Sequence, residues 1–329
     1  MPAKRVLSGM RPSGRLHLGH LEGVLKNWLK LQDEYDCFFF VADWHALTDN
    51  LDTSDRADNI RSMVIDWLSA GIDPEKCTIF IQSEVPRHAE LHLLLSMVTP
   101  VGWLERCPTY KDKINDSGAA ASPSYGLLGY PVLQTADILM YRAEMVPVGQ
   151  DQVAHLEIGR EIARRFNGIF GDVFPEPVPL LTNSAKLAGL DGRKMSKSYG
   201  NSILISDSDE EIKKKVQSMI TDPARVYRKD KGHPEVCGVF AYHGIFSPGA
   251  CPEIASSCRE ALIGCSDCKK KLALNLSGYL EPLREKRWRI EKSPGIVRDV
   301  LEGGRRKASG NAEETMLVVK KAMRFTDRI

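Results

Sequence analysis

Residues 6–20 read VLSGMRPSGRLHLGH, an apolar run of strand length followed by a turn rich in glycine and histidine. Residues 6–9 have the composition of a short buried strand that ends in a glycine turn. From Gly19 onward, apolar side chains recur at helical spacing, at Leu21, Val24, Leu25, Trp28 and Leu29. A strand that leads directly into a helix N-terminus presents free backbone N–H groups, which suit a bound phosphate.

Strands and helices continue to alternate up to about residue 185. Residues 37–42 form a continuous apolar run, typical of a parallel strand that is buried on both faces. Further strands are expected at residues 78–82 and 145–149, with helices over 54–70, 87–98 and 151–166. This pattern predicts a doubly wound α/β fold with a parallel sheet.

Helical patterns dominate the rest of the chain. Ser208 and Glu211 match a capping box for a helix to about residue 220. More helices are expected over residues 252–263, 269–291, 294–302 and 312–324, with a basic turn at 303–307. We therefore predict a catalytic domain over residues 1–187 and a smaller all-helical domain over 188–329. The polar segment 108–126 is expected to be a mobile loop beside the active site.

The composition narrows the class of protein. Of the 329 residues, 43% are hydrophobic and 27% are charged, as in ordinary globular proteins. The net charge of +2 is too small to predict a polyanion partner over the whole surface. No run of about 18 apolar residues predicts a membrane span, and the N-terminus has no signal-peptide core. We expect a cytoplasmic protein whose eight cysteines are reduced or bind a metal.

A second polar motif, residues 194–198, reads KMSKS and is called the lysine motif; residues 12–20 are called the first motif. Lys194 and Lys197 suit the negative charge that grows on the β- and γ-phosphates when the α-phosphorus of ATP is attacked. In the first motif, His17 and His20 can donate hydrogen bonds to phosphate, and Gly19 allows close approach of adenine. Alone, the first motif could be a helix N-terminus with two surface histidines, and the lysine motif could be a solvated basic turn. In this order, the two motifs indicate the two halves of one ATP site.

The two motifs resemble the signature motifs of class I aminoacyl-tRNA synthetases. Residues 130–139 (YPVLQTADIL), 146–152 (VPVGQDQ) and 155–157 (HLE) narrow the resemblance to the tryptophanyl-tRNA synthetases, and it extends from about Leu7 to the end of the chain. The resemblance implies a Rossmann-like catalytic domain and a helical domain that binds the tRNA anticodon. It also implies activation of L-tryptophan by ATP with Mg²⁺, transfer to tRNA(Trp), and a homodimer.

The resemblance further implies the role of individual residues. Catalysis falls to Lys194, Lys197, His17 and His20. The residues around ATP are Arg11, Pro12, Ser13, Gly19, His20, Gly149, Gln150, Asp151, Leu187, Lys194, Met195, Ser196, Lys197 and Ser198. The residues around tryptophan are Asp137, Tyr130, Gln152 and Gly9. Arg11 and Gln134 differ from some members of the family, which leaves the shape of the tryptophan pocket open.

Asp137 can also be argued from chemistry. The indole nitrogen is only a donor, so a buried acceptor suits tryptophan and is left unpaired by phenylalanine. Sites built on such a hydrogen bond can discriminate by about 10⁴–10⁵. From the residues alone, Asp137 could equally be a helix N-cap near Pro131. The resemblance favours the contact with indole.

Five of the eight cysteines lie between residues 237 and 268. Four of them have a spacing that suits zinc or an iron–sulfur cluster: Cys237, Cys258, Cys265 and Cys268. Spacing alone favours zinc. Certain tryptophanyl-tRNA synthetases carry a [4Fe–4S] cluster on a similar arrangement, so the resemblance implies that cluster, with zinc or free thiols as alternatives and Cys251 as a spare. Its expected role is structural, because it would present the basic face of the next helix to tRNA.

Three other functions match parts of the sequence. A tyrosyl-tRNA synthetase shares the fold and both motifs, but it would need a site for a phenolic hydroxyl, and the context of Asp137 argues against one. A nucleotidylyltransferase of the same superfamily usually lacks a helical domain with four cysteines. A regulatory RNA-binding paralogue without activity should have lost Lys194 and Lys197, and both are present.

Overall fold

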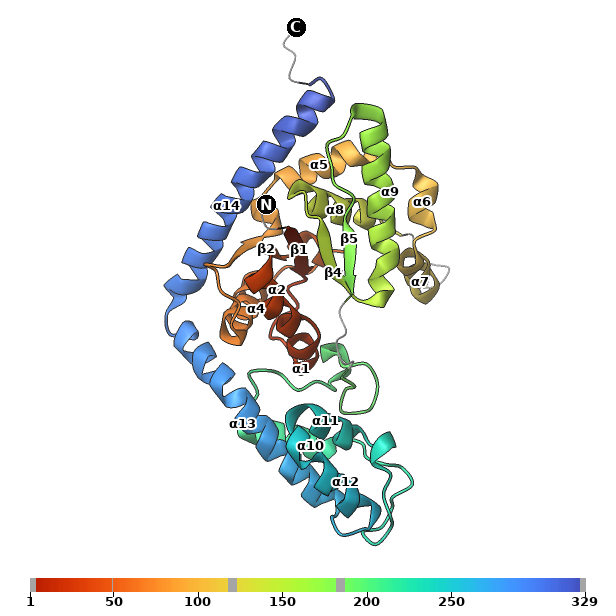
Figure 1. The fold of residues 1–329 in the computed structure, drawn as a ribbon, viewed down its shortest axis with the longest axis vertical. Coiled ribbons are helices and arrows are strands. Elements are labelled where there is room, and N and C mark those ends of the chain that lie inside the picture. Colours follow the sequence, from red (N-terminus) through yellow and green to blue (C-terminus); the bar gives the residue numbers. More distant parts are fainter. Residues whose placement is uncertain (1–3, 49, 118–122, 182–186, 326–329) are drawn as a thin grey trace.

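The computed structural model describes residues 4–48, 50–117, 123–181 and 187–325 (Figure 1). A five-stranded parallel sheet lies at its centre, in the order β3-β2-β1-β4-β5. The strands are β1 (Arg5–Met10), β2 (Asp36–Val41), β3 (Cys77–Ile81), β4 (Met145–Val148) and β5 (Val178–Leu181). The predicted doubly wound α/β fold is confirmed. The strand order reverses between β1 and β4, where folds of this kind bind their ligands.

Strand β2 shows why both faces of the sheet are covered. Phe38 and Phe40 pack into one core and Phe39 into the other, and all three side chains are buried. Phe39 stacks on Trp28, with ring centroids 4.2 Å apart. A strand that is apolar at every position is stable only between two layers.

Helices form both of those layers. The core that holds Phe39 contains side chains of α2 (Lys26–Glu34) and α4 (Arg56–Ala70). The opposite core contains side chains of α5 (Arg87–Ser96), α8 (Tyr125–Met140) and α9 (Val153–Phe170). Shorter helices complete this part of the chain: α1 (Leu18–His20), α3 (Asp43–Ala46), α6 (Val101–Glu105) and α7 (Pro108–Ser117). Because α7 is helical, the prediction of a loop over 108–126 is wrong for its first ten residues, and residues 118–122 lie outside the described part.

A second group of helices lies beyond one end of the sheet (Figure 1). It consists of α10 (Asp209–Ser218), α11 (Gly238–Phe246), α12 (Cys251–Arg259) and most of α13 (Cys265–Glu291). The capping box of α10 is confirmed, because the Ser208 amide donates to Glu211 Oε2 (2.8 Å) and the Glu211 amide donates to Ser208 Oγ (3.3 Å). Among the described residues, no helix has the length and apolar character needed to span a bilayer.

Helix α14 (Pro294–Ala322) returns to the sheet instead of joining the second group (Figure 1). It is one continuous helix, so the prediction of two helices joined by a basic turn at 303–307 is wrong. Ala308, Ala312, Met316 and Val319 are buried in the same core as α5 and α8. The last helix therefore packs on the part of the chain predicted to be catalytic, and the predicted boundary at residues 187 and 188 stays a prediction.

Gly304 explains how α14 approaches β3 so closely. A Cβ atom at this position would overlap the carbonyl oxygen of Ile79. The glycine pair at 303 and 304 is an unfavourable helix sequence, but packing against the strand overrides that local preference. Strand β3 is an edge strand of the sheet, and α14 covers it.

Replacing Gly304 with Ala should lower the free energy of unfolding by about 1–3 kcal/mol, because α14 would have to move away from β3. Gly310→Ala is the matched control in the same helix, since nothing lies within 4 Å of its added Cβ. It should be neutral or stabilise by up to about 1 kcal/mol, because alanine favours helix. Urea denaturation measures both variants, and an equal effect of the two substitutions would contradict the packing argument.

Candidate active site

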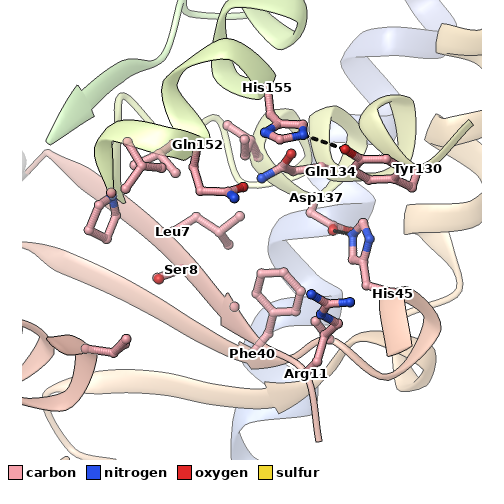
Figure 2. A pocket seen from close by; sticks show the side chains of 18 of the residues that line it. Leu7, Ser8, Arg11, Phe40, His45, Tyr130, Gln134, Asp137, Gln152 and His155 are labelled. Carbon is pink, nitrogen blue, oxygen red and sulfur yellow. Dashed lines mark hydrogen bonds and ion pairs between the residues drawn. The ribbon is translucent and has the colours of Figure 1, made fainter. Parts of the chain in front are cut away.

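A cavity of about 370 Å³ opens where the strand order reverses (Figure 2). Its walls come from the ends of β1, β2 and β4, from a π-helical turn at Leu21–Leu25, and from α8 and α9. All four residues predicted to contact tryptophan line this cavity: Gly9, Tyr130, Asp137 and Gln152. The structure thus brings together side chains that lie up to 143 residues apart, from residue 9 to residue 152.

Asp137 lies in this wall, surrounded by hydrogen-bond donors. Gln82 Nε2 donates to both carboxylate oxygens, at 2.8 and 2.9 Å. His45 Nε2 lies 2.8 Å from Oδ2, and His88 Nδ1 lies 2.6 Å from Oδ1. Burial acts to raise the pKa of Asp137, but the hydrogen bonds from His45 and His88 outweigh it and lower the pKa to about 2. The carboxylate is therefore ionised at neutral pH and is an acceptor in the cavity wall.

Asp137 is not a helix N-cap, so the alternative derived from the residues alone is wrong. It lies in the last turn of α8, whose N-cap is Ser124. The side chains that surround it were not predicted. His45 and Gln82 follow the carboxyl ends of β2 and β3, where α/β proteins place functional groups, and this position is the signal that could have identified them.

Tyr130 forms a second polar group in the cavity wall, two turns before Asp137 on α8, and its hydroxyl points toward His155 of α9 (Figure 2). Its hydroxyl is hydrogen-bonded to His155 Nε2 and lies 3.4 Å from Cys107 Sγ. Burial raises the pKa of Tyr130, so the hydroxyl keeps its proton at neutral pH. Gln152 also lines the cavity, so Tyr130, Gln152 and Asp137 all present polar atoms to it.

Gly9 shapes the floor of the cavity. A Cβ atom on Gly9 would overlap the ring of Phe40, which also lines the cavity. The glycine therefore allows the Phe40 ring to lie flat against β1.

The first motif and the lysine motif lie side by side. The backbone around the first motif pairs with residues that follow the lysine motif: the Leu18 amide donates to the Ile203 carbonyl, and the Ile205 amide donates to the Leu16 carbonyl, both at 2.9 Å. Lys197 Nζ donates to the backbone carbonyls of Ser13 and Arg15, the latter at 2.9 Å.

His17 and His20 carry no positive charge at neutral pH. Their ring centroids are 3.8 Å apart at the start of α1. Burial, reinforced by the charge of Lys197, lowers the pKa of His17 to about 4. Burial and the neighbouring His17 and Lys197 lower the pKa of His20 to about 3. Both rings are thus neutral imidazoles, each with one N–H that can donate.

The other residues predicted to contact ATP are less tightly grouped. Arg11 and Gly149 line the cavity, and Met195 Sδ would lie 3.7 Å from a Cβ on Gly19. Ser13 contacts Lys197, and the Ser196 amide donates to Asn201 Oδ1 at 2.8 Å. Pro12 is half-buried, Leu187 is buried, and Gln150, Lys194 and Ser198 are exposed. The side chain of Asp151 lies outside the described part of the structure.

The four cysteines lie in the second group of helices. Cys237 precedes α11, Cys258 lies near the end of α12, and Cys265 and Cys268 begin α13. All four are free thiols and partly buried. Burial and the three neighbouring cysteines raise the pKa of Cys268 to about 12, so the four thiols face a common region. Within the described residues, no three His, Cys, Asp or Glu side chains stand in position to hold a metal ion.

A buried arginine accompanies these thiols. The Arg225 side chain contacts Cys258 Sγ at 3.5 Å and the carbonyls of Arg228 and Ile263 at 3.1 and 2.7 Å. Its Nε has no hydrogen-bond partner, and no carboxylate of the described residues forms an ion pair with it. A buried cation needs an anion nearby, and metal-bound thiolates would provide one. The chemistry of this group therefore fits a metal–thiolate centre, although the thiols are not arranged as a ligand set.

Comparison with known proteins agrees with this geometry. Residues 2–281 match the family model described as tRNA synthetases class I (W and Y). The tryptophan–tRNA ligase of Thermotoga maritima is 51% identical over 323 residues, which cover 97% of this chain and 98% of that protein. The chain belongs to the tryptophanyl-tRNA synthetases of class I. This synthetase is also 42% identical to the tryptophan–tRNA ligase of Aquifex aeolicus, over 97% of this chain and 99% of that protein.

A solved structure supports the same placement. The tryptophanyl-tRNA synthetase of Campylobacter jejuni, crystallised with ADP and tryptophan, superimposes with a TM-score of 0.88 at 35% identity. The superposition covers 97% of this synthetase and 99% of that chain.

Gly9→Ala should weaken binding of L-tryptophan roughly tenfold, because the added Cβ displaces the Phe40 ring into the cavity and overpacks it. Isothermal titration calorimetry measures the dissociation constant directly. Gly102→Ala is the control, since its added Cβ meets nothing within 4 Å and Gly102 does not line the cavity. Unchanged tryptophan affinity in folded Gly9→Ala protein would show that the amino acid binds elsewhere.

Proposed function

We propose that this synthetase holds ATP between its first motif and its lysine motif, binds L-tryptophan in the cavity, and joins them as tryptophanyl-adenylate. The tryptophanyl group then passes to tRNA(Trp). Membership of the family makes the chain a tryptophan–tRNA ligase that uses ATP. The contact of Lys197 with Ser13 and Arg15 is the observation that carries the assignment of ATP to this place, because it joins two polar motifs that are distant in sequence.

Asp137 is proposed to accept the indole N–H of tryptophan. Its two oxygens already accept four hydrogen bonds from Gln82, His45 and His88, which is about the capacity of a carboxylate. Of these three partners, only His45 lines the cavity. Bound tryptophan would therefore take the place of His45 on Oδ2, while Gln82 and His88 keep the carboxylate oriented. Phenylalanine would displace His45 without replacing its hydrogen bond.

Tyr130 and Gln152 are proposed to hold the amino group at the other end of the substrate. Both side chains line the same cavity as Asp137, and the carboxylate of tryptophan is proposed to face the first motif. Because Gly9 has no side chain, the Phe40 ring can pack against it, and this packing leaves space for the indole ring of tryptophan. Arg11 and Gly149, at the mouth of the same cavity, are proposed to contact ATP together with Pro12, Gln150, Asp151 and Leu187.

The tryptophan carboxylate would attack the α-phosphorus, so the P–O bond to pyrophosphate breaks as the acyl–phosphate bond forms. The substrate supplies the nucleophile, and no covalent protein residue is required. Lys197, with Lys194 recruited from solvent, would balance the charge that develops on pyrophosphate, and Met195, Ser196 and Ser198 would shape the closed loop. His17 and His20 would donate from neutral rings. Mg²⁺, held mainly by the phosphates, would neutralise their charge.

Lys197→Ala should reduce the kcat of tryptophan-dependent ATP–pyrophosphate exchange by about 10²–10³, because the lost charge acts in the transition state. The dissociation constant for tryptophan should stay the same. Lys213→Ala, an exposed lysine of α10, is the control and should keep full activity. Equal losses in exchange and in tryptophan binding would contradict a transition-state role. Exchange driven by tyrosine and not by tryptophan would contradict the function itself.

The second group of helices is proposed to bind the tRNA anticodon. Exposed basic side chains follow the surface of α13: Lys270, Lys271, Lys286 and Arg289. Arg287 lies on the same helix, but it is only 5% exposed and does not belong to this surface. Arg284 is also engaged, since its Nη1 lies 2.6 Å from Asp209 Oδ1. The available surface is therefore smaller than the sequence suggests, yet it suits phosphate contacts.

The four cysteines are proposed to hold a [4Fe–4S] cluster, with zinc as the alternative. The nearby buried cation of Arg225 supports an anionic centre at this place. Such a centre would fix the starts of α11 and α13 and so hold the basic surface in place.

Protein purified without oxygen should be brown and contain about four iron and four sulfide per chain. Cys258→Ser should lose most of the iron, because it removes a ligand. Cys251→Ser is the matched control and should keep it, since the Cys251 thiol donates to the Ser247 carbonyl instead. Elemental analysis decides the identity of the metal. Colourless protein with one zinc per chain would show that the site binds zinc and not the cluster. Metal-free protein that binds tRNA normally would contradict the proposal of a metal centre.

A homodimer in the cytoplasm completes the proposal. Large apolar side chains are exposed on α5 and at the start of α6, at Leu93 (54%), Met97 (71%) and Val101 (56%). A second copy of the chain would cover this surface.

A further inference from the structure

A buried ion pair connects helix α13 to helix α4. Arg287 of α13 is 5% exposed and Asp66 of α4 is completely buried, and Arg287 Nη1 contacts Asp66 Oδ1. The same guanidinium donates to the carbonyl and the hydroxyl of Ser62, both at 3.2 Å, and to Glu291 Oε1 at 2.8 Å. Several partners thus fix the position of Arg287, and its positive charge lies next to the Asp66 carboxylate.

The other oxygen of Asp66 reaches the first motif. Oδ2 accepts a hydrogen bond of 2.7 Å from the Leu16 backbone amide. The Leu16 carbonyl accepts from the Ile205 amide at 2.9 Å, so this one residue is held from both sides. Leu16 stands between the Arg15 carbonyl, which accepts from Lys197, and His17. Any movement of the Asp66 carboxylate would therefore change the backbone that is proposed to surround the phosphates.

A purely structural role does not explain this arrangement. A buried ion pair is weak evidence for stability, because the cost of removing both charges from water often exceeds their attraction. Burial raises the pKa of Asp66 to about 6 in spite of Arg287, the Leu16 amide and Arg15. The pair thus holds a carboxylate in its charged form where an apolar side chain would pack at lower cost. Unlike an apolar side chain, the Asp66 carboxylate provides a fixed hydrogen-bond acceptor for the Leu16 backbone amide of the first motif.

Helix α13 connects the Arg287–Asp66 contact to the cysteines of the second group of helices. It begins at the cysteines and ends next to Arg287, and its 27 residues correspond to about 40 Å of helix. The helix stays continuous through Pro282 and packs on α10 and α11 of the second group as well as on α4, so it links the two parts of the chain.

We propose that Arg287, acting through Asp66, positions the backbone of the first motif at Leu16, so that the second group of helices sets the affinity of the synthetase for ATP. Arg287 and Asp66 are positioning residues and touch no substrate. This inference rests on the proposed role of the first motif in ATP binding.

The test measures the KM for ATP in tryptophan-dependent exchange and, separately, the dissociation constant for tryptophan. Arg287→Met should raise the ATP KM about tenfold, the effect of weakening one charge-assisted hydrogen bond. Tryptophan affinity should remain within about twofold, because Asp137 and the cavity are not in contact with Arg287. Arg287→Lys keeps a positive charge beside Asp66 and should restore most of the ATP affinity. Glu291→Gln removes only the exposed partner of Arg287 and should leave the ATP KM unchanged.

A double-mutant cycle identifies the route. If Arg287 acts through Asp66, then Arg287→Met causes no further rise in ATP KM when Asp66 is already Asn. Additive effects would overturn the proposal, as would an unchanged ATP KM in folded Arg287→Met protein. Should that variant fail to fold, Asp66→Asn is compared with the double variant, which leaves no buried unpaired charge. Equal ATP KM values then support the proposal, and a further rise overturns it.

The outcome is separable from that of the proposed function. If Lys197→Ala reduces exchange by the expected factor of about 10²–10³ while Arg287→Met leaves the ATP KM unchanged, only the positioning role fails. If the wild-type protein shows no exchange with tryptophan, the function fails first.

Discussion

The backbone pairing between the first motif and residues 203–205 is the constraint on which the rest of the active site depends. The two hydrogen bonds at Leu16 and Leu18 fix the depth at which the lysine motif lies over the start of α1. Backbone pairs of this kind do not depend on side-chain identity, so the surrounding residues are free to provide chemistry. Lys197 then reaches the carbonyls of Ser13 and Arg15, and burial beside it keeps His17 and His20 neutral.

Two different physical environments meet at the end of β1. On the cavity side, apolar residues such as Leu7, Phe40 and Ile138 surround the ionised Asp137, which is held in place by Gln82, His45 and His88. The motif side is made of backbone groups, neutral imidazoles and a lysine. An amino acid with an apolar ring and a charged carboxylate matches this change from apolar to polar surroundings. The arrangement explains why substrate recognition and charge stabilisation need not share residues.

The sequence was sufficient for the features that depend on local pattern. Strand β2 was predicted because its apolar run is continuous, and the motifs that resemble a family pointed to four residues that line the cavity. Strand β5 was missed because it lies in a segment with three prolines, Pro175, Pro177 and Pro179, a composition that is typical of a loop. The Asp66–Arg287 pair could not be predicted, since 221 residues separate its members and neither has a distinctive local context. The continuity of α14 was missed because its glycine pair indicates a break, and only the position of β3 explains why it does not break.

The packing of α14 on β3 has a consequence for biosynthesis. The chain emerges from the ribosome N-terminus first, so β3 and its neighbours are exposed long before the residues that cover them have been translated. Until α14 docks, the growing polypeptide carries an uncovered sheet edge and an open apolar core beside α5 and α8. The sheet and this core are therefore complete only after α14 has been translated, and until then the nascent chain exposes an apolar surface to which chaperones can bind.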